Sequence, residues 1–414
     1  MNKLLGSTCI FIIFMTGIAT AEDNQRITPF EEKISNSTLY QSRIQKWSVA
    51  FHKDLAIQET VGPFDFIDEN NLIFVSRCGK VNILKIDNSN LRVISNQKLP
   101  VPNNQLFCGT KDSPLLEKQL AGVKGIVFDS FNNILYVLHT VSEFGDKLCV
   151  PTSGLLSYFS KNKCIGIKVE AYKLDSNLQL HFSHVVYQST LRSIKKTAFT
   201  QEGGGMTMDS LGNLIFAIGD FGYLEEGFDI SNNKNSFGKV FIYSPITKNT
   251  NILAKGIRNT AGLYFDKTTK IIYGVDHGPK GGDEINVIRQ GDNLGWPLST
   301  YGTGYESQAC ADYFHGCSHS AGKKPLFAYL PDIGINSVLV IPQSSSFLNW
   351  KGDLIVGALS QPNIMRLRLA DGVVKYSESI PVYTNRLRYL KLSPSGKLYG
   401  LADEGTLIAI SPSN

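Results

Sequence analysis

The sequence has little excess charge and lacks long runs of like charge. It contains 41 Lys and Arg residues against 36 Asp and Glu residues, for a formal net charge of +5 over 414 residues. A nucleic-acid-binding protein would show a basic face, so we expect no nucleic-acid partner. C-x-x-C and H-E-x-x-H motifs are absent, and no G-x-S-x-G motif has a strand–turn–helix context, which argues against zinc sites and hydrolase chemistry. The triplet Gly203-Gly204-Gly205 is not followed by Gly-Lys-Ser/Thr, so it predicts no phosphate loop.

Long hydrophobic runs are also scarce. The first 21 residues combine a basic Lys3, an apolar run from Cys9 to Ile18 and the small residues Ala19-Thr20-Ala21. This order is typical of a secretory signal peptide. A membrane anchor is the alternative, but the run is shorter than the ~20 residues of a spanning helix. We expect a signal peptide at residues 1–21, a periplasmic or secreted protein, and no membrane span in the mature chain.

Cysteines are few, and six of the seven remain after the predicted signal peptide. An even number in an exported chain favours disulfide bonds. Pairing of nearest neighbours would join Cys78 to Cys108, Cys149 to Cys164, and Cys310 to Cys317. Other connectivities remain open.

Helical periodicity is weak, whereas one strand–turn–strand phrase recurs along the chain. The copies are FDFIDENNLIFVSR from Phe64, GIVFDSFNNILYVLHT from Gly125, GMTMDSLGNLIFAIGD from Gly205, GLYFDKTTKIIYGVD from Gly262, SVLVIPQSSSFLNWKGDLIVGAL from Ser337 and LKLSPSGKLYGLAD from Leu390. Turn residues between apolar runs indicate β-hairpins. Six copies predict an all-β protein with a six-bladed β-propeller, one sheet per blade. A β-sandwich is the alternative. We expect an N-terminal extension at residues 22–49 and the propeller at residues 50–414.

An Arg-Asn pair, Arg258 and Asn259, precedes one of these strands in GIRNTAGLYF. Arginine binds carboxylates with two parallel hydrogen bonds, and its flat face stacks on aromatic rings. Asparagine offers both a donor and an acceptor. On its own, the pair is typical of a loop salt bridge with an Asx-turn, or of a site that binds an acidic group; the family resemblance described below favours the binding site.

A Gly-Pro turn, Gly278 and Pro279, follows in HGPKGGDEIN. Such a turn can present two backbone carbonyls in one direction, and calcium accepts carbonyl oxygens as ligands. Asp283 and Glu284 belong either to this site or to a turn that caps the next strand. We expect a structural role for His277.

Arg386 and Arg388 alternate in YTNRLRYLKL, so both side chains should point to one face of a strand. Like charges on one face repel each other unless an anion lies between them. A carboxylate of a bound ligand would supply that anion. An exposed edge strand protected by charge is the alternative.

The order GIRNTAGLYF, HGPKGGDEIN and GDNLGWP resembles the soluble quinoprotein sugar dehydrogenases of the glucose/sorbosone dehydrogenase family, over most of the mature chain. The resemblance implies pyrroloquinoline quinone (PQQ) and Ca²⁺ as cofactors. It implies that Arg258, Asn259, Arg386 and Arg388 bind PQQ, and that the carbonyls of the Gly278-Pro279 turn bind Ca²⁺.

The chain departs from the family pattern at several positions. The family's general base is a histidine, and counting back from Gly219-Asp220 places Gln201 at this position. A glutamine side chain is not a general base, and a slip of one residue would bring the carboxylate of Glu202 there instead. The family's cofactor-binding lysine falls at about Ser360. Gln119 lies close to a substrate-contacting glutamine of the family.

The resemblance implies an oxidoreductase that oxidises the C1 hydroxyl of an aldose, or another alcohol, by hydride transfer to PQQ with the assistance of Ca²⁺. Arg258 would stabilise charge on the reduced quinone oxygen, and an external electron acceptor would be needed. The alternative is a propeller that binds a partner without turnover, which the glutamine at position 201 favours.

Overall fold

The structure of the protein is a computed structural model. It describes residues 26–27, 42–48, 61–87, 90–102, 122–144, 149–150, 163–193, 201–222, 232–303, 319–360, 363–382, 386–403 and 405–412. The predicted signal peptide lies outside the described residues, as do Gln119, Cys108, Cys310 and Cys317. Cys78 is disulfide-bonded, and the predicted pairings remain predictions.

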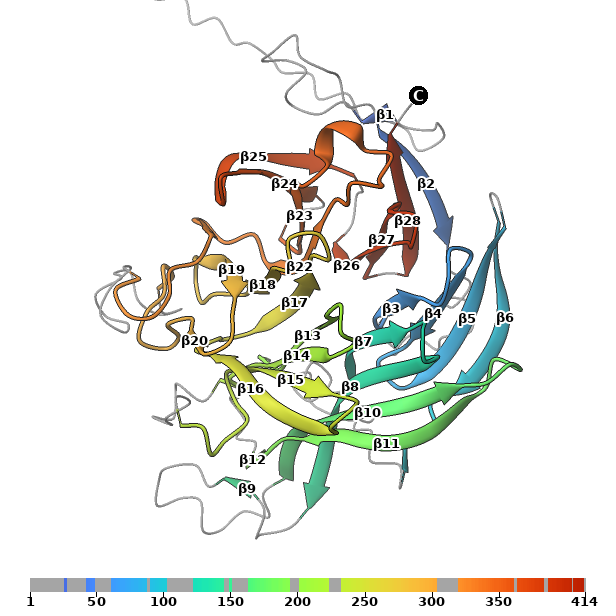
Figure 1. Ribbon diagram of the computed structural model, residues 1–414, viewed down its shortest axis with the longest axis horizontal. Coiled ribbons are helices and arrows are strands. Elements are labelled where there is room, and N and C mark those ends of the chain that lie inside the picture. The colour runs from blue at the N-terminus through green and yellow to red at the C-terminus, as the bar shows by residue number, and fades with distance from the viewer. Residues whose placement is uncertain are drawn as a thin grey trace, which may run out of the picture.

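Six β-sheets stand around one axis like the blades of a propeller (Figure 1). Blade 1 consists of β3 (Phe64–Phe66), β4 (Asn71–Val75), β5 (Lys80–Asp87) and β6 (Asn90–Lys98). Blade 2 consists of β7 (Val123–Asp129), β8 (Ile134–Phe144), β10 (Lys163–Leu174) and β11 (Leu180–Gln188), with the short strands β9 (Cys149–Val150) and β12 (Leu191–Ser193). Blade 3 consists of β13 (Gly203–Met208), β14 (Leu214–Ile218), β15 (Lys239–Ser244) and β16 (Asn249–Lys255), with β20 (Asp292–Asn293) at its edge.

The other three blades follow the same plan. Blade 4 consists of β17 (Thr260–Phe265), β18 (Ile272–Asp276), β19 (Asp283–Ile288) and β21 (Phe327–Tyr329). Blade 5 consists of β22 (Ile335–Val340), β23 (Leu354–Ala358), β24 (Asn363–Ala370) and β25 (Val373–Pro381), with the 3₁₀ helix η6 (Leu348–Trp350) before β23. Blade 6 consists of β26 (Leu387–Leu392), β27 (Leu398–Ala402), β28 (Thr406–Pro412) and β2 (Ser42–Ser48), with β1 (Arg26–Ile27) beyond. The predicted six-bladed, all-β architecture is confirmed.

The two ends of the chain meet in blade 6. Strand β2 pairs antiparallel with β28, so that Ser42 lies opposite Pro412 and Ser48 opposite Thr406. The predicted boundary at residue 50 is therefore wrong, because residues 42–48 belong to the propeller sheet. The segment carries no copy of the repeated phrase, and it gains its partner only when the ring closes.

Aspartates fix the turns between first and second strands. The Asp129 carboxylate accepts hydrogen bonds from the backbone N–H groups of Phe131 and Asn132, at 3.0 and 3.1 Å. Asp209 does the same in blade 3, and Asp68 and Asp266 do so in blades 1 and 4. Such bonds mimic a backbone turn. The repeated phrase thus encodes one hairpin per blade.

The first strands of the blades form an inner ring. They contact one another in the order β3, β7, β13, β17, β22 and β26, and β26 returns to β3. Their beginnings are adjacent: a Cβ on Gly205 in β13 would lie 3.0 Å from Gly262 in β17, and a Cβ on Gly262 would lie 2.8 Å from Ser337 in β22. Neighbouring inner strands therefore run the same way. The segments that enter them meet at one end of the ring, which we call the mouth.

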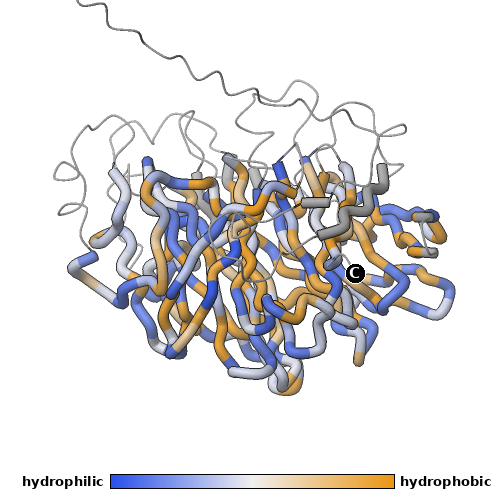
Figure 2. The backbone as a smooth tube through the Cα atoms, turned by 90° about the horizontal axis from the view of Figure 1, so that it is seen from above, coloured by the Kyte–Doolittle hydropathy of each residue, from blue (hydrophilic) through white to orange (hydrophobic). Residues whose placement is uncertain are grey.

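The core lies between the blades. Six hydrophobic clusters are present in the described structure, and each joins two neighbouring blades around the ring. Apolar and polar segments alternate along the strands in the side view (Figure 2). Because both faces of each sheet are covered, the scaffold holds the mouth segments in fixed relative positions. No helix in the described part of the chain is long and apolar enough to cross a membrane.

Candidate active site at the mouth of the propeller

Polar side chains of second strands hold the segments that enter the same blades. In blade 2, Thr140 Oγ1 accepts a hydrogen bond from the Gly122 N–H at 2.7 Å. In blade 4, the Asp276 carboxylate accepts from the N–H groups of Arg258 and Asn259 at 2.8 and 2.6 Å. These bonds set the position of each entering segment, and therefore of the side chains that it carries into the mouth.

Arg258 is buried at the centre of the candidate site. Its Nη1 donates to the carbonyls of His277 and Gly278, at 2.9 and 2.7 Å. Its guanidinium carbon lies 5.5 Å from the centre of the Trp296 ring. The Arg-Asn segment and the Gly-Pro turn, which we selected separately in the sequence, are therefore in direct contact.

Asn259 and Asp276 tie this segment to its surroundings. The Asn259 side-chain oxygen accepts a hydrogen bond from the Gly203 N–H at 3.0 Å, which joins blade 4 to blade 3. Thr260 Oγ1 donates to Asp276 at 3.2 Å. Burial raises the pKa of Asp276 to about 6, although the hydrogen bonds from residues 258 and 259 and the charge of Arg258 oppose this rise. The Asp276 carboxylate thus fixes the backbone of the Arg-Asn pair.

The Gly278-Pro279 turn is held by Asp283. The Asp283 carboxylate is fully buried and accepts a hydrogen bond from the Gly278 N–H at 3.0 Å. Its second oxygen accepts from the N–H groups of Ile333 and Ile335 at 3.0 and 2.9 Å. Asp283 therefore shapes the turn and links it to blade 5. Gly278 and Pro279 are both buried.

Glu284 lies opposite Asp276 in the pairing of β18 with β19. It lies 3.6 Å from the Nε2 atom of His319 and accepts a hydrogen bond from the Asn286 amide at 3.3 Å. Burial, with a smaller effect of the Asp276 charge, raises the pKa of Glu284 to about 8. Burial lowers the pKa of His319. Both groups are therefore held in their neutral forms near neutral pH.

Gln201 is buried beside Arg258, and both ends of its amide are hydrogen-bonded. With its amide nitrogen toward Asp220 and its amide oxygen toward Arg258, it donates to the Asp220 carboxylate and accepts from Arg258 Nη2 at 2.6 Å. Asp220 also accepts from the indole N–H of Trp296 at 2.8 Å. An amide so held orients Arg258, and it has no basic atom that could take a proton.

Glu202 points the other way, toward blade 2. Its side chain is 6% exposed, and its Oε2 lies 3.5 Å from the Lys124 ammonium in β7. Its Oε1 has no hydrogen-bond partner among the described residues. Of the two adjacent residues that the sequence proposed for proton transfer, Glu202 is the one with a carboxylate.

Arg386 and Arg388 share one carboxylate, as their alternation requires, and it belongs to the protein. Arg388 Nη2 donates to Asp403 Oδ2 at 2.9 Å, and its Nε donates to Asp403 Oδ1. Arg386 Nε lies 3.6 Å from the same residue and is more exposed. The Asn336 amide donates to the carbonyls of Leu387 and Arg388, both at 2.8 Å.

Ser360 lies beside the turn that Asp283 organises. Its hydroxyl donates to the Ile333 carbonyl at 2.6 Å, and its side of the loop is exposed. Gln119 belongs to the undescribed part of the chain, so its predicted role remains a prediction.

The sequence reasoning missed the acids that position the site. Asp220, Asp276 and Asp403 all stand at the end of a second strand, in the phrases AIGD, YGVD and GLAD. This shared place in the repeat was the available signal. Lys124 and Trp296 gave no comparable signal, because their partners come from other blades.

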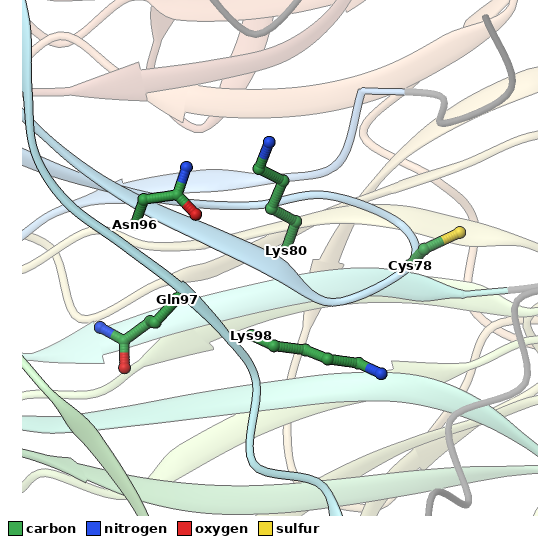
Figure 3. Close-up of a pocket in the computed structure, with 5 residues that line it drawn as sticks. All are labelled: Cys78, Lys80, Asn96, Gln97 and Lys98. Atoms are coloured by element: carbon green, nitrogen blue, oxygen red, sulfur yellow. The ribbon is translucent and has the colours of Figure 1, made fainter. Parts of the chain in front are cut away.

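A separate depression lies on the outer strands of blade 1. It is lined by Cys78, Lys80, Asn96, Gln97 and Lys98, with a volume of about 260 Å³ (Figure 3). Its lining contains no acid or histidine, and it shares no residue with the mouth.

The chain resembles known proteins in both sequence and fold. Residues 62–409 match the family model described as glucose/sorbosone dehydrogenase. The chain is 28% identical over 225 residues to the aldose sugar dehydrogenase YliI of Escherichia coli, an alignment that covers 51% of this chain and 60% of that protein. It is 31% identical over 150 residues to an uncharacterised Synechocystis protein, covering 36% and 35% of the two chains. The chain therefore aligns with less than two thirds of the length of either relative.

The solved structures show the same fold. The apo form of the soluble aldose sugar dehydrogenase from Escherichia coli superposes with a TM-score of 0.66 at 20% identity, covering 90% of this chain and all of that one. The PQQ-bound aldose sugar dehydrogenase from Streptomyces coelicolor gives a TM-score of 0.59 at 14% identity, covering 90% and 98%. At these identities the likeness concerns the fold alone. With the family model matching most of its length, the chain belongs to the glucose/sorbosone dehydrogenase family.

Proposed function

We propose that this protein is a quinone-dependent oxidoreductase that oxidises the C1 hydroxyl of an aldose, or another alcohol, with PQQ and Ca²⁺ bound at the mouth. The observation that carries the proposal is the 2.7 Å contact between Arg258 Nη1 and the Gly278 carbonyl. It brings the segment expected to bind the quinone to the turn expected to bind the metal. We also propose export to the periplasm or the outside of the cell, on the sequence of residues 1–21.

The donors at the mouth suit an acidic, planar ligand. Arg258, Lys124 and Arg388 supply positive charge, and Asn259 supplies an amide. Arginine is well matched to carboxylates. The Gly278 carbonyl has two lone pairs, and Arg258 takes one of them, so an oxygen for a hard cation remains next to the guanidinium. The residues present therefore fit both PQQ and Ca²⁺.

When bound, PQQ would supply the hydride-accepting chemistry, and an external acceptor would later remove the two electrons. The protein would position the reactants. Arg258 is oriented by two carbonyls, by Gln201 and by the Trp296 ring, so its guanidinium is preorganised for developing negative charge. Asp276 holds the backbone of the Arg-Asn pair and would keep that geometry during the reaction.

The hydroxyl proton needs an acceptor, and we assign this role to Glu202. Gln201 is excluded by its chemistry, whereas Glu202 has a buried carboxylate with one oxygen on Lys124 and the other without a hydrogen-bond partner in the described structure. Lys124 holds the Glu202 side chain in place through the contact between its ammonium and Oε2 at 3.5 Å.

A second candidate is a propeller that binds its ligand without turnover. The locked amide of Gln201 between Asp220 and Arg258 favours it. This candidate retains the binding half of the proposal and omits the chemistry.

Titration of the purified protein with PQQ, in the presence and absence of Ca²⁺, tests the binding half. We expect a change in the visible absorbance of PQQ that Arg258→Met abolishes. Arg368→Met is the matched control, because this arginine is part-exposed in blade 5. Absence of PQQ binding by the wild-type protein would refute the proposed function.

Dye reduction with a panel of aldoses tests turnover. We expect activity that Glu202→Gln removes while PQQ binding persists. PQQ binding without any sugar oxidation would support the second candidate, and recovery of activity in Gln201→His would identify the missing base as the cause.

A further inference from the structure

Three cationic side chains from three blades meet on one side of the mouth. Lys124 is the second residue of β7 in blade 2, and Arg388 is the second residue of β26 in blade 6. Arg77 follows β4 in blade 1, and its carbonyl accepts a hydrogen bond from the Val123 N–H at 2.8 Å. Blades 6, 1 and 2 are consecutive around the ring, so these side chains come from neighbouring walls.

The backbone makes room for the Lys124 side chain. A Cβ on Gly204 would lie 2.9 Å from the Cβ of Lys124, and a Cβ on Gly125 would lie 2.2 Å from the Gly204 carbonyl. Side chains at these two positions would push β7 and β13 apart. The triplet Gly203-Gly204-Gly205, which is no phosphate loop, thus serves the close approach that buries Lys124.

The three cations interact electrostatically. Burial lowers the pKa of Lys124 to about 8 against the opposing effect of Glu202, and the charges of Arg77 and Arg388 lower it further. The Tyr389 phenol lies within reach of the same two arginines, whose charges oppose the rise in its pKa that burial causes. Arg388 is also held by Asp403. The cluster therefore combines three positive groups and a phenol on one wall.

We propose that Arg77, Lys124 and Arg388, with the Tyr389 hydroxyl, form a subsite for a carboxylate group of the ligand at the mouth. Two arginines and an ammonium can surround the two oxygens of a carboxylate with charge-assisted hydrogen bonds. The carboxylate belongs either to the quinone, in which case the inference rests on the proposed function, or to an acidic sugar such as a hexuronic acid. In the first case Lys124 supplies, from blade 2, the ammonium that Ser360 does not supply from blade 5.

The test measures ligand binding by titration calorimetry, at low and high salt, with PQQ, glucuronate and glucose. The double variant Lys124→Met/Glu202→Gln removes the ion pair without leaving a buried charge, and Arg77→Gln removes a second cation. Lys267→Met is the control, because it removes an exposed lysine from the β17–β18 turn at the far end of the ring. Thermal unfolding of each variant checks that it is folded.

We expect the double variant and Arg77→Gln each to weaken binding of the carboxylate ligand about 10-fold to 100-fold. High salt should weaken wild-type binding. Weaker PQQ binding assigns the subsite to the cofactor, and weaker glucuronate binding with unchanged PQQ binding assigns it to an acidic sugar. The inference is overturned if neither affinity differs from that of Lys267→Met, even where PQQ binds the wild type normally. If PQQ does not bind the wild type at all, the proposed function fails, and glucuronate binding alone tests the subsite. Weaker glucuronate binding by the variants than by the wild type then supports the subsite. Failure of glucuronate to bind the wild type overturns the subsite.

Discussion

Two buried arginines, each packed over a tryptophan, have different surroundings. In blade 5, Arg366 is fully buried, 5.4 Å from the Trp350 ring centre, and donates to the carboxylates of Asp353 and Glu378 at 2.7 Å each. In blade 4, Arg258 lies over Trp296 and donates to the carbonyls of His277 and Gly278. One guanidinium is bound by acids within its own blade, and the other by main-chain oxygens and the Gln201 amide oxygen at the mouth.

The difference distinguishes an arginine that stabilises the fold from an arginine that is positioned to bind a ligand. Burial alone would lower the pKa of Arg366, but Asp353 and Glu378 reverse this effect and raise it above the ordinary value. In blade 4 the shifted pKa values are those of acids: burial raises the pKa of Asp276 and the pKa of Glu284. We infer that blade 5 is arranged for stability, whereas blade 4 keeps an arginine in position for a ligand.

The largest expected effect on stability is that of Arg366→Met. The substitution removes the fully buried guanidinium from between the carboxylates of Asp353 and Glu378, and breaking such a buried pair costs about 3–5 kcal/mol. Denaturant unfolding measures it. The control Arg368→Met touches the same Asp353 from a side chain that is 43% exposed, so we expect a loss of about 0–1 kcal/mol. Equal losses in the two variants would contradict a structural role specific to Arg366.

The buried acids of blade 4 predict that the free energy of unfolding depends on pH. Glu284 has its folded-state pKa raised from 4.5 to about 8. A group of this kind contributes stability that is fully present below its unfolded pKa and is lost as pH rises through its folded pKa. The free energy of unfolding should therefore fall between about pH 5 and pH 8, by roughly 2–4 kcal/mol.

The variant Glu284→Gln tests this assignment, because a glutamine does not ionise. We expect its unfolding free energy to change less than that of the wild type between the same two pH values. Glu69→Gln, on a part-exposed residue of blade 1 whose pKa is lowered, should keep the wild-type fall. An unchanged pH profile in Glu284→Gln would show that another group causes it.

A third substitution, Arg258→Met, should destabilise the protein less than Arg366→Met but weaken PQQ binding more. Its loss of hydrogen bonds to two carbonyls and to the Gln201 amide oxygen, all neutral acceptors, costs about 1–3 kcal/mol of stability, less than the loss from Arg366→Met. Its effect on PQQ affinity should be about 100-fold, while folded Arg366→Met should retain wild-type affinity. Calorimetric binding and denaturant unfolding of both variants give the four values. If Arg258→Met is the more destabilising and leaves PQQ affinity intact, the contrast between the blades is wrong.

The sequence could predict features that are determined locally, but not contacts that form only when the ring closes. The hairpins were predictable because alternating apolar runs and an aspartate such as Asp129 determine each one locally. That Arg258 and Gly278 belong to one site was predictable through the family resemblance, but their direct contact was not. The pairing of residues 42–48 with β28, and of Lys124 with Glu202, was not, since the partners come together only when the ring closes. Asp403 shows the same limit: the alternation of Arg386 and Arg388 indicated an anion between them but not its source.

The smallest expected effect concerns Ser360, the position where the resemblance implies a lysine. Ser360→Ala removes one hydrogen bond to the Ile333 carbonyl at an exposed site, so its stability should change by less than about 1 kcal/mol. Ser360→Lys should tighten PQQ binding several-fold in the wild type. In the background of Lys124→Met/Glu202→Gln it should recover most of the lost affinity, because one ammonium then replaces another at the same ligand. Titration of PQQ into the two backgrounds measures the coupling. A gain of equal size in both backgrounds would mean that the two positions act on different groups, and that Lys124 does not compensate for the absent lysine.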